Sequence, residues 1–395
     1  MSIPRAVFAA ALLLVIGSDA LARIKLVTLP VRDRVAIRLD HPQATLVEEE
    51  RVIPLVAGVN QVDFSWRNTR VDPDTLVFRV LPAAAEGAAR DVRVLSVSYP
   101  PGEAALVWSV AAASSGPARV RISYLLGGLD KTDHYRASAD PDERRLTLEH
   151  YTRIINQANE SFDSALIWPG VGEPFERPLE QATTKELLLA RYEGVAVVKT
   201  YTVDPAEHGW LDRSQDKLNV PMHYRLSNDA AHGLGRTPLP YGKARIFQRD
   251  GQGGSAFLGE DWAEYTPLEE DLELFLGLAR DIVVRRTVLR NERRERTGPL
   301  HDIDVVLRYE IENFKDAAVR IDLVEHPRWI RDQLYGHRDH EPEWTLGPRT
   351  SLPEPPDPEA TDQLRVTLPV PLPPRAGDTA PKHTYLLHLR FHNEW

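Results

Sequence analysis

The sequence predicts an all-β protein made of two or more antiparallel β-sandwich domains, of the immunoglobulin or fibronectin kind, with little helix. Three observations support this fold class. Apolar and polar side chains alternate with a period of two residues along much of the chain, turn-forming residues separate the alternating segments, and long amphipathic helix patterns are scarce.

The alternating segments are the expected strands, because successive side chains of a strand point to opposite faces of a sheet. The clearest segment is 303–311, in which every second residue is apolar and the residues between are mostly polar. One face of this strand is therefore expected in the core and the other mostly in water. Three shorter segments show the same pattern: Val35–Leu39, Leu76–Val80 and Val120–Leu126.

Turn residues stand between these segments. Ala57–Asn60 and the pair Asp72–Pro73 are typical of turns. The run Asp250–Gly254 predicts a hairpin between strands at 244–249 and 255–259.

Helix is expected to be scarce. Two segments, 185–192 and 269–279, fit helical spacing, but both are ambiguous, and in the second alternate leucines fit a strand as well. The sequence leaves these two segments open.

Composition suggests where the domains divide. The chain has 395 residues, more than a single hydrophobic core usually supports. After Gly127–Gly128 it becomes more polar, which predicts domains at 23–126 and 127–395. Residues 335–362 are rich in proline and are expected to form a long loop inside the second domain, because strands resume at Leu364.

The first 22 residues are typical of a cleavable export signal. Arg5 precedes an apolar run, Ala6–Gly17, and small residues occupy Ala20 and Ala22. The apolar run is well short of the ~20 residues that a spanning helix needs. We therefore expect cleavage after Ala22, a periplasmic location and no transmembrane anchor after cleavage.

Composition indicates which classes of partner the protein can bind. The chain has no cysteine, which excludes disulfides, thiolate metal sites and a lipid-bearing cysteine, so stability must come from buried apolar surface. The net charge of -10 argues against nucleic acid and against anionic membrane surfaces. An envelope protein or a polysaccharide remains as the expected partner.

An ordered series of segments carries a family resemblance. The segments are Ala44–Val56, Asp72–Asp74, Ile122–Tyr135, Leu146–Leu148, Asn156–Ala165, Gly242–Asp250, Leu258–Trp262, Thr266–Pro267, Tyr309–Asp316 and Val324–His326. In this order the chain resembles the domain of unknown function at the C-terminus of bacterial mucoidy-inhibitor-A-like proteins, in a short form without the coiled-coil insertion. The resemblance implies an all-β, exported envelope protein and supplies no catalytic residues.

Charged side chains cluster in two stretches. The acidic stretch, 260–273, could supply the paired carboxylates of a glycoside hydrolase, although a solvated strand edge is the favoured interpretation. The basic stretch could bind an anionic glycan, but we expect it to pair with the acidic stretch across the sheet. Its arginines are Arg285, Arg286, Arg290, Arg293, Arg294 and Arg296.

Two groups of histidines could supply metal ligands. The loop His337–Glu341 has two imidazoles and two carboxylates, but a solvated polar loop is favoured, because ordering a flexible chain opposes binding. His388 and His392 are expected on a surface strand face, ~13 Å apart. No metal and no cofactor is predicted.

Tryptophans could form a carbohydrate-binding surface, since flat rings stack on sugars, but core packing is the favoured role. Those in or near predicted turns are Trp66, Trp168, Trp210, Trp262, Trp329 and Trp344. The surface candidates for a site are Glu260, Asp261, Trp262, His326, Arg293 and Arg294.

These observations favour an exported, non-enzymatic envelope protein that acts as a binding or scaffolding module. The alternative is a carbohydrate-active enzyme or glycan-binding protein that uses the stretch 260–273. A remote alternative is an outer-membrane β-barrel, because alternation from Tyr385 ends on the terminal aromatic Trp395.

Overall fold

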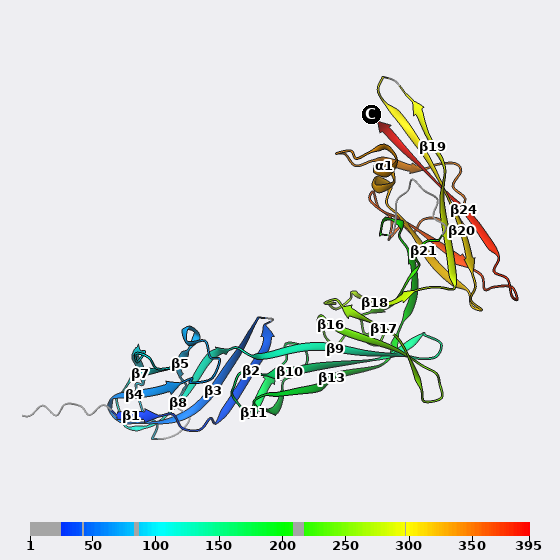
Figure 1. Ribbon diagram of the computed structural model, residues 1–395. Coiled ribbons are helices and arrows are strands. Elements are labelled where there is room, and N and C mark those ends of the chain that lie inside the picture. Colours follow the sequence, from blue (N-terminus) through cyan, green and yellow to red (C-terminus); the bar gives the residue numbers. More distant parts are fainter. Residues whose placement is uncertain (1–24, 42, 83–86, 208–216, 297) are drawn as a thin grey trace, which may run out of the picture. The chain divides into compact units, whose positions relative to one another are not determined.

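The structure is a computed structural model that describes residues 25–41, 43–82, 87–207, 217–296 and 298–395. The predicted all-β class is confirmed, since several mostly antiparallel sheets account for most of these residues (Figure 1). Within the described ranges the one α-helix is α1, Pro327–Tyr335. The predicted export signal and Trp210 lie outside the described residues.

The chain forms two compact units. The first takes the described residues up to Lys131 and then Ile154–Lys185, and the second takes Thr132–Arg153 and Glu186–Trp395. The chain first passes between the units close to the predicted boundary at 126/127. It then returns, because β11 (Phe162–Trp168) pairs in parallel with β2 (Arg34–His41) of the first unit. Alternation within one segment carries no information about such a long-range pairing.

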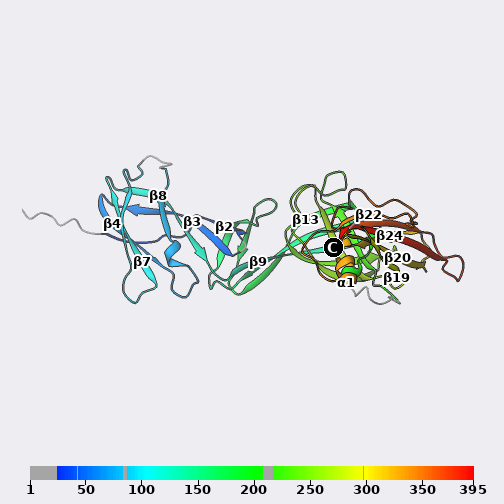
Figure 2. The ribbon, with the colours of Figure 1, turned by 90° about the horizontal axis from the view of Figure 1, so that it is seen from above.

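The first unit contains two sheets, whose strands are seen from another side in Figure 2. One has the order β1 (Lys25–Thr28), β4 (Gly58–Ser65), β7 (Ala105–Ala112), β6 (Arg93–Ser98). The other has the order β12 (Phe175–Leu179), β11, β2, β3 (Ala44–Leu55), β8 (Gly116–Leu126), β5 (Val77–Val80). Ring contacts join them, such as Phe64 of β4 with Tyr124 of β8 at 5.8 Å.

The second unit begins with a five-stranded sheet of order β13, β10, β9, β16, β17. Their bounds are Thr183–Ala196, Arg145–Asn156, Leu129–Ala139, Gly242–Arg249 and Ser255–Ala263. Buried side chains such as Tyr135, Leu146 and Ile246 pack with Tyr224 of β15 (Pro221–Ser227) and Leu274 of β18 (Asp271–Leu278) in one hydrophobic cluster. Both segments that the sequence left open form strands: 185–192 lies within β13, and most of 269–279 forms β18.

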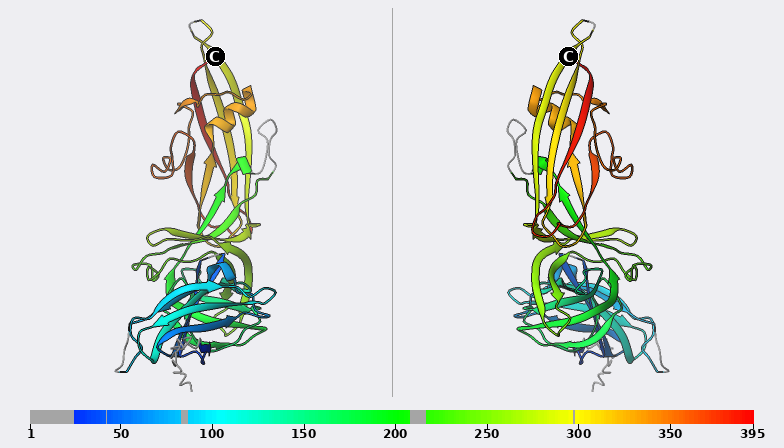
Figure 3. Two further views of the ribbon diagram at one scale, coloured as in Figure 1. Left: turned by 90° about the vertical axis from the view of Figure 1, so that its left-hand side faces the viewer. Right: turned by 90° about the vertical axis from the view of Figure 1, so that its right-hand side faces the viewer.

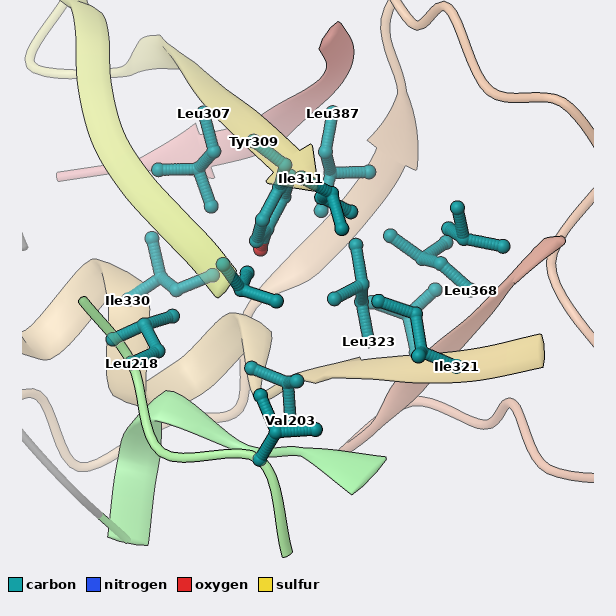
Figure 4. Close-up of a cluster of buried hydrophobic side chains, with 14 of the residues drawn as sticks. Val203, Leu218, Leu307, Tyr309, Ile311, Ile321, Leu323, Ile330, Leu368 and Leu387 are labelled. Atoms are coloured by element: carbon teal, nitrogen blue, oxygen red, sulfur yellow. The ribbon is translucent and has the colours of Figure 1, made fainter. Parts of the chain in front are cut away.

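A second hydrophobic cluster in this unit lies between two further sheets (Figures 3 and 4). One has the order β18, β15, β14 (Val198–Val203), β21 (Val319–Glu325), β23 (Val366–Leu372). The other has the order β19 (Ile282–Glu295), β20 (His301–Asn313), β24 (Lys382–Glu394), β22 (Glu343–Leu346). Two short 3-10 turns occur at Pro73–Thr75 and Pro205–Glu207 of the described chain.

Strand β20 confirms the alternation of 303–311, whose apolar side chains are all fully buried in this second cluster. The opposite face of β20, expected mostly in water, instead carries buried carboxylates. Asp302 is 7% exposed and Asp304 2% exposed. Arg294 of β19 and Arg390 of β24 form ion pairs with Asp304, and Arg296, just after β19, pairs with Asp302, so the charges are buried with partners.

Much of the proline-rich segment 335–362 lies along the edge of β24 that does not pair with β20. It contains β22, and beyond it the amide of Gly347 donates to the carbonyl of His388 at 2.7 Å, and the amide of Ser351 donates to that of Leu386 at 2.8 Å. His388 is therefore only 1% exposed, and its predicted place on a surface face is wrong. Among the described residues no helix is long and apolar enough to cross a membrane.

Candidate functional site

The predicted hairpin is confirmed and carries the best candidate site. β16 and β17 pair antiparallel on either side of the loop 250–254. The Asp250 carboxylate accepts from the amides of Gln252 at 2.8 Å and Gly254 at 2.9 Å, which closes the loop. Gly251 and Gly253 have φ values of 75° and 96°, a backbone region that glycine adopts without steric cost.

A β-bulge then decides which side chains share a face. The register shifts between Ile246 and Phe247, so that Leu258 is passed over on β17. As a result Lys243 lies opposite Trp262 and Arg245 lies opposite Glu260. Trp262 and Glu260 are on β17, the last strand of its sheet, and Lys243 and Arg245 are on the neighbouring inner strand β16.

The site centres on two stacked rings. Tyr241, just before β16, stacks on Trp262 with ring centroids 5.2 Å apart and an interplanar angle of 2°. The two side chains are 52% and 50% exposed. The ammonium of Lys243 lies 5.1 Å from the indole centroid. We call Tyr241, Lys243 and Trp262 the aromatic platform.

Two cations of this surface share one carboxylate. Lys243 Nζ lies 2.8 Å from Glu260 Oε1, and Arg245 Nε lies 3.4 Å from Glu260 Oε2. The hydrogen bond from Lys243 lowers the pKa of Glu260, with smaller contributions from the charges of both cations. Glu260 is therefore a carboxylate that is hard to protonate.

Asp261 has a different role from its neighbours. Its Oδ2 accepts from the amide of Phe275 on β18 at 2.7 Å, and its Oδ1 accepts from the amide of Trp262 at 2.8 Å. Asp261 therefore fixes strand β17 against β18 and holds the backbone that carries the indole.

The surface continues inward across the sheet. β9 pairs in parallel with β16, which places His134 beside Lys243. The His134 ring stacks on Tyr151 of β10 at 5.3 Å with an interplanar angle of 11°. Burial, the largest contribution, lowers the pKa of His134, so its ring is neutral at pH 7. Tyr241, His134 and Tyr151 were not predicted as site residues.

Arg293 and Arg294 lie elsewhere, on β19. Arg294 Nη2 lies 2.6 Å from an oxygen of Asp304, and Arg293 Nε lies 3.2 Å from one of Glu295. The predicted partner of the basic stretch is therefore wrong, since its ion pairs join residues of β19, β20 and β21. The others are Arg285–Glu312, Arg286–Glu325, Arg290–Glu292 and Arg296–Asp302. The reason is the strand order, in which β19 adjoins β20 and not β17 or β18.

Asp304 is the centre of the densest of these groups. Its carboxylate lies 2.9 Å from Arg390 Nε and 3.1 Å from His388 Nε2, besides Arg294. Burial alone would raise the pKa of Asp304, but the hydrogen bonds from Arg390 and His388 with the nearby charges lower it overall. This arrangement stabilises a charge and offers no free acid or base.

His326 directly precedes α1 and pairs with Asp204, with Nε2 and Oδ2 2.8 Å apart. Its side chain is 32% exposed. Within the described chain, no hydrogen bond or ion pair joins His326, the two arginines and the platform. The six predicted surface candidates therefore fall into three groups, of which only Glu260, Asp261 and Trp262 lie together.

The acidic stretch and the histidine loop are also candidates from the sequence, and the structure gives their surroundings. An open groove of ≈ 460 Å³ has residues of the acidic stretch in its lining, among them Glu264, Glu270 and Glu273. In the histidine loop, His337 contacts Asp332 at 3.0 Å, while His340 stacks on Trp395 with centroids 5.8 Å apart. In the part of the chain that the structure describes, no group of three or more histidine, aspartate or glutamate side chains could hold a metal ion.

The tryptophans divide between core and surface. Trp329 and Trp344 pack against the second cluster of the second unit. Trp168 is 36% exposed and stacks under Arg38, whose guanidinium is 4.9 Å from its ring. Trp66 lines a pocket of the first unit.

In comparisons with known proteins, no family model and no curated protein matches this chain.

Proposed function

We propose that this protein is an exported, non-enzymatic binding module of the bacterial cell envelope, and that it holds a polysaccharide on the aromatic platform. The observation that carries the proposal is the exposed, coplanar stack of Tyr241 on Trp262 at a sheet edge. Export is supported by the residue pattern of 1–22, and the envelope by the family resemblance of the chain.

The chemistry of the platform suits sugars. An aromatic face attracts the C–H face of a sugar ring through burial of apolar area and through its negative quadrupole. Lys243 and Arg245 supply donors and Glu260 supplies acceptors at the rim of the same surface. Glu260 engages both cations, so neither is left free to pair with an anion, and we expect the platform to bind a neutral polysaccharide mainly through stacking on its rings.

The enzymatic alternative needs a carboxylic acid that donates a proton, and glycosidases obtain one by raising its pKa. Glu260 has the opposite perturbation, because Lys243 lowers its pKa. Asp261 is engaged by two backbone amides. The two carboxylates named by the alternative are thus held for binding and for structure.

The test is binding of the full mature chain to a panel of neutral and anionic polysaccharides by affinity electrophoresis. Trp262→Ala should weaken binding by about tenfold or more, which corresponds to ~1.4 kcal/mol for the lost stacking. Trp168→Ala is the matched control, since it removes an exposed tryptophan from the other unit.

Equal binding by Trp262→Ala and the wild type would contradict the proposal. So would release of products from a glycan by the purified protein. In that case Glu260→Gln and Asp261→Asn, in variants that remain folded, would identify which carboxylate performs the reaction.

A further inference from the structure

The first unit contains a pocket of ≈ 230 Å³ that the sequence did not indicate. Its walls come from both sheets, through Phe64 of β4, Arg51 of β3 and Tyr124 of β8, and from the turn that holds Trp66. The volume is smaller than that of sites for drug-sized ligands. We call it the Tyr124 pocket.

Tyr124 marks the pocket as a binding position. Its side chain is 1% exposed, and its hydroxyl has no hydrogen-bond partner among the described residues. Buried hydroxyls normally have partners. Burial raises the pKa of Tyr124, and the charges of Glu49 and Glu160 raise it further, so the hydroxyl keeps its proton and can donate to a ligand.

The charges around the pocket do not leave a free cation. Glu49 is fully buried and contacts both Arg32 and Arg51, the latter with Nη2 at 3.0 Å from Oε2. Arg32 also contacts Glu160. The two guanidiniums are therefore matched by two carboxylates, which removes the attraction that an anionic ligand would need.

The other walls supply an acceptor and an apolar surface. Asp63 lines the pocket; its backbone pairs within the sheet, but among the described residues its carboxylate has no hydrogen bond or ion pair. Its carboxylate adds one negative charge to the neutral set of arginines and glutamates, which further disfavours anions. Phe64 and Trp66, with ring centroids 6.5 Å apart, provide aromatic surface.

We propose that the Tyr124 pocket binds a single sugar ring that carries no negative charge. The Tyr124 hydroxyl donates a hydrogen bond to one hydroxyl oxygen of the sugar, and the Asp63 carboxylate accepts one from another sugar hydroxyl. The rings of Phe64 and Trp66 cover the C–H face of the sugar. This site is in the first unit, so it is separate from the aromatic platform, and its test does not depend on the proposed function.

The test uses the full mature chain and saturation-transfer NMR with glucose, N-acetylglucosamine and glucuronate. The first two sugars should bind and glucuronate should not. Tyr124→Phe should weaken binding about three- to tenfold, the usual effect of one hydrogen bond, while leaving thermal stability unchanged, because the hydroxyl has no protein partner. Asp63→Asn should also weaken binding.

Tyr135→Phe is the matched control. Tyr135 is equally buried in the second unit, but its hydroxyl donates to the carbonyl of Pro240 at 2.6 Å. This variant should lose stability and keep sugar binding. Absence of binding by both uncharged sugars, unchanged affinity in Tyr124→Phe, or glucuronate binding as tight as glucose binding would each overturn the proposal. Because Trp262→Ala leaves this pocket intact, a failure here is distinguishable from a failure of the platform.

Discussion

The buried pair Arg286–Glu325 is expected to be the most sensitive ionic contact of the second unit. Arg286 Nε and Nη2 each lie 2.7 Å from one oxygen of Glu325, and the Tyr309 hydroxyl donates to the same carboxylate. The two charged side chains are 3% and 1% exposed. Glu325→Gln would leave the guanidinium buried beside a neutral amide.

The magnitude follows from that burial. Removing one partner of a buried ion pair costs about 3–5 kcal/mol of the free energy of unfolding, because the remaining charge stays out of water. For a unit of this size, each kcal/mol lowers the melting temperature by ~2–4 °C. Glu325→Gln should therefore lower the melting temperature by roughly 10 °C, measured by differential scanning calorimetry.

The control is the exposed pair Arg293–Glu295, whose side chains are 51% and 72% exposed. Glu295→Gln should change the unfolding free energy by only ~0–1 kcal/mol. Replacing Arg286 by Met, Glu325 by Leu and Tyr309 by Phe together should recover most of the loss, since apolar side chains need no partner and the Tyr309 hydroxyl would otherwise lose its acceptor. The reasoning is refuted if Glu325→Gln is no more damaging than Glu295→Gln.

Two further predictions concern residues that contact β24, one in the segment along its edge and one on β20. Gly347→Ala would place a Cβ 2.1 Å from Nδ1 of His388, so we expect the segment to move off the edge of β24. Urea unfolding should show a loss of about 1–3 kcal/mol in the free energy of unfolding. Gly127→Ala is the control, because its Cβ would meet its nearest atom at 3.6 Å. Asp304, whose pKa is lowered in the folded chain, contributes stability that is present above the unfolded pKa of ~3.9 and is lost as pH falls through the lower folded value. Asp304→Asn should therefore be less stable than the wild type at pH 7 and should lose less stability than the wild type when the pH is lowered from 5 to 3, as followed by thermal melts; parallel pH profiles would contradict this assignment.

The fold class could be predicted because alternation is a local property. The alternate apolar residues of 303–311, from Ile303 to Ile311, are all buried on one face of β20, as their spacing requires. What lies beside each strand is a long-range property and was predicted less well. Arg286 and Arg294 of β19 pair with carboxylates on β21 and β20 and not with the acidic stretch. The order of the strands, rather than their charge, decides which stretches are neighbours.

The helix α1 had local signals that were passed over. Pro327 stands in its first turn, and Gly336 follows its end with a φ of 88°. Proline at the start and glycine just past the end are the expected boundaries of a helix. The segment is short, and only Ile330 among its apolar residues is fully buried, so its periodicity is weak.

The candidate site shows where sequence reasoning stops. Trp262 and Glu260 could be named from the sequence, and the loop 250–254 identified the hairpin. Counting outward from that loop without a bulge would place Lys243 opposite Asp261 rather than Trp262. A shift of one residue exchanges the faces of a strand, so the stack of Tyr241 on Trp262 depends on a bulge at Leu258 that residue types do not encode clearly.

The return of residues 154–185 to the first unit has a practical meaning for dissecting this chain. A fragment cut at Lys131 would lose β11 and β12, and β2 would become the bare margin of its sheet. Its unpaired amides and carbonyls would then be free to recruit a strand from another molecule. The first unit is therefore complete only once the ribosome has passed residue 185, and a single cut after Lys185 would release it only together with Thr132–Arg153 of the second unit.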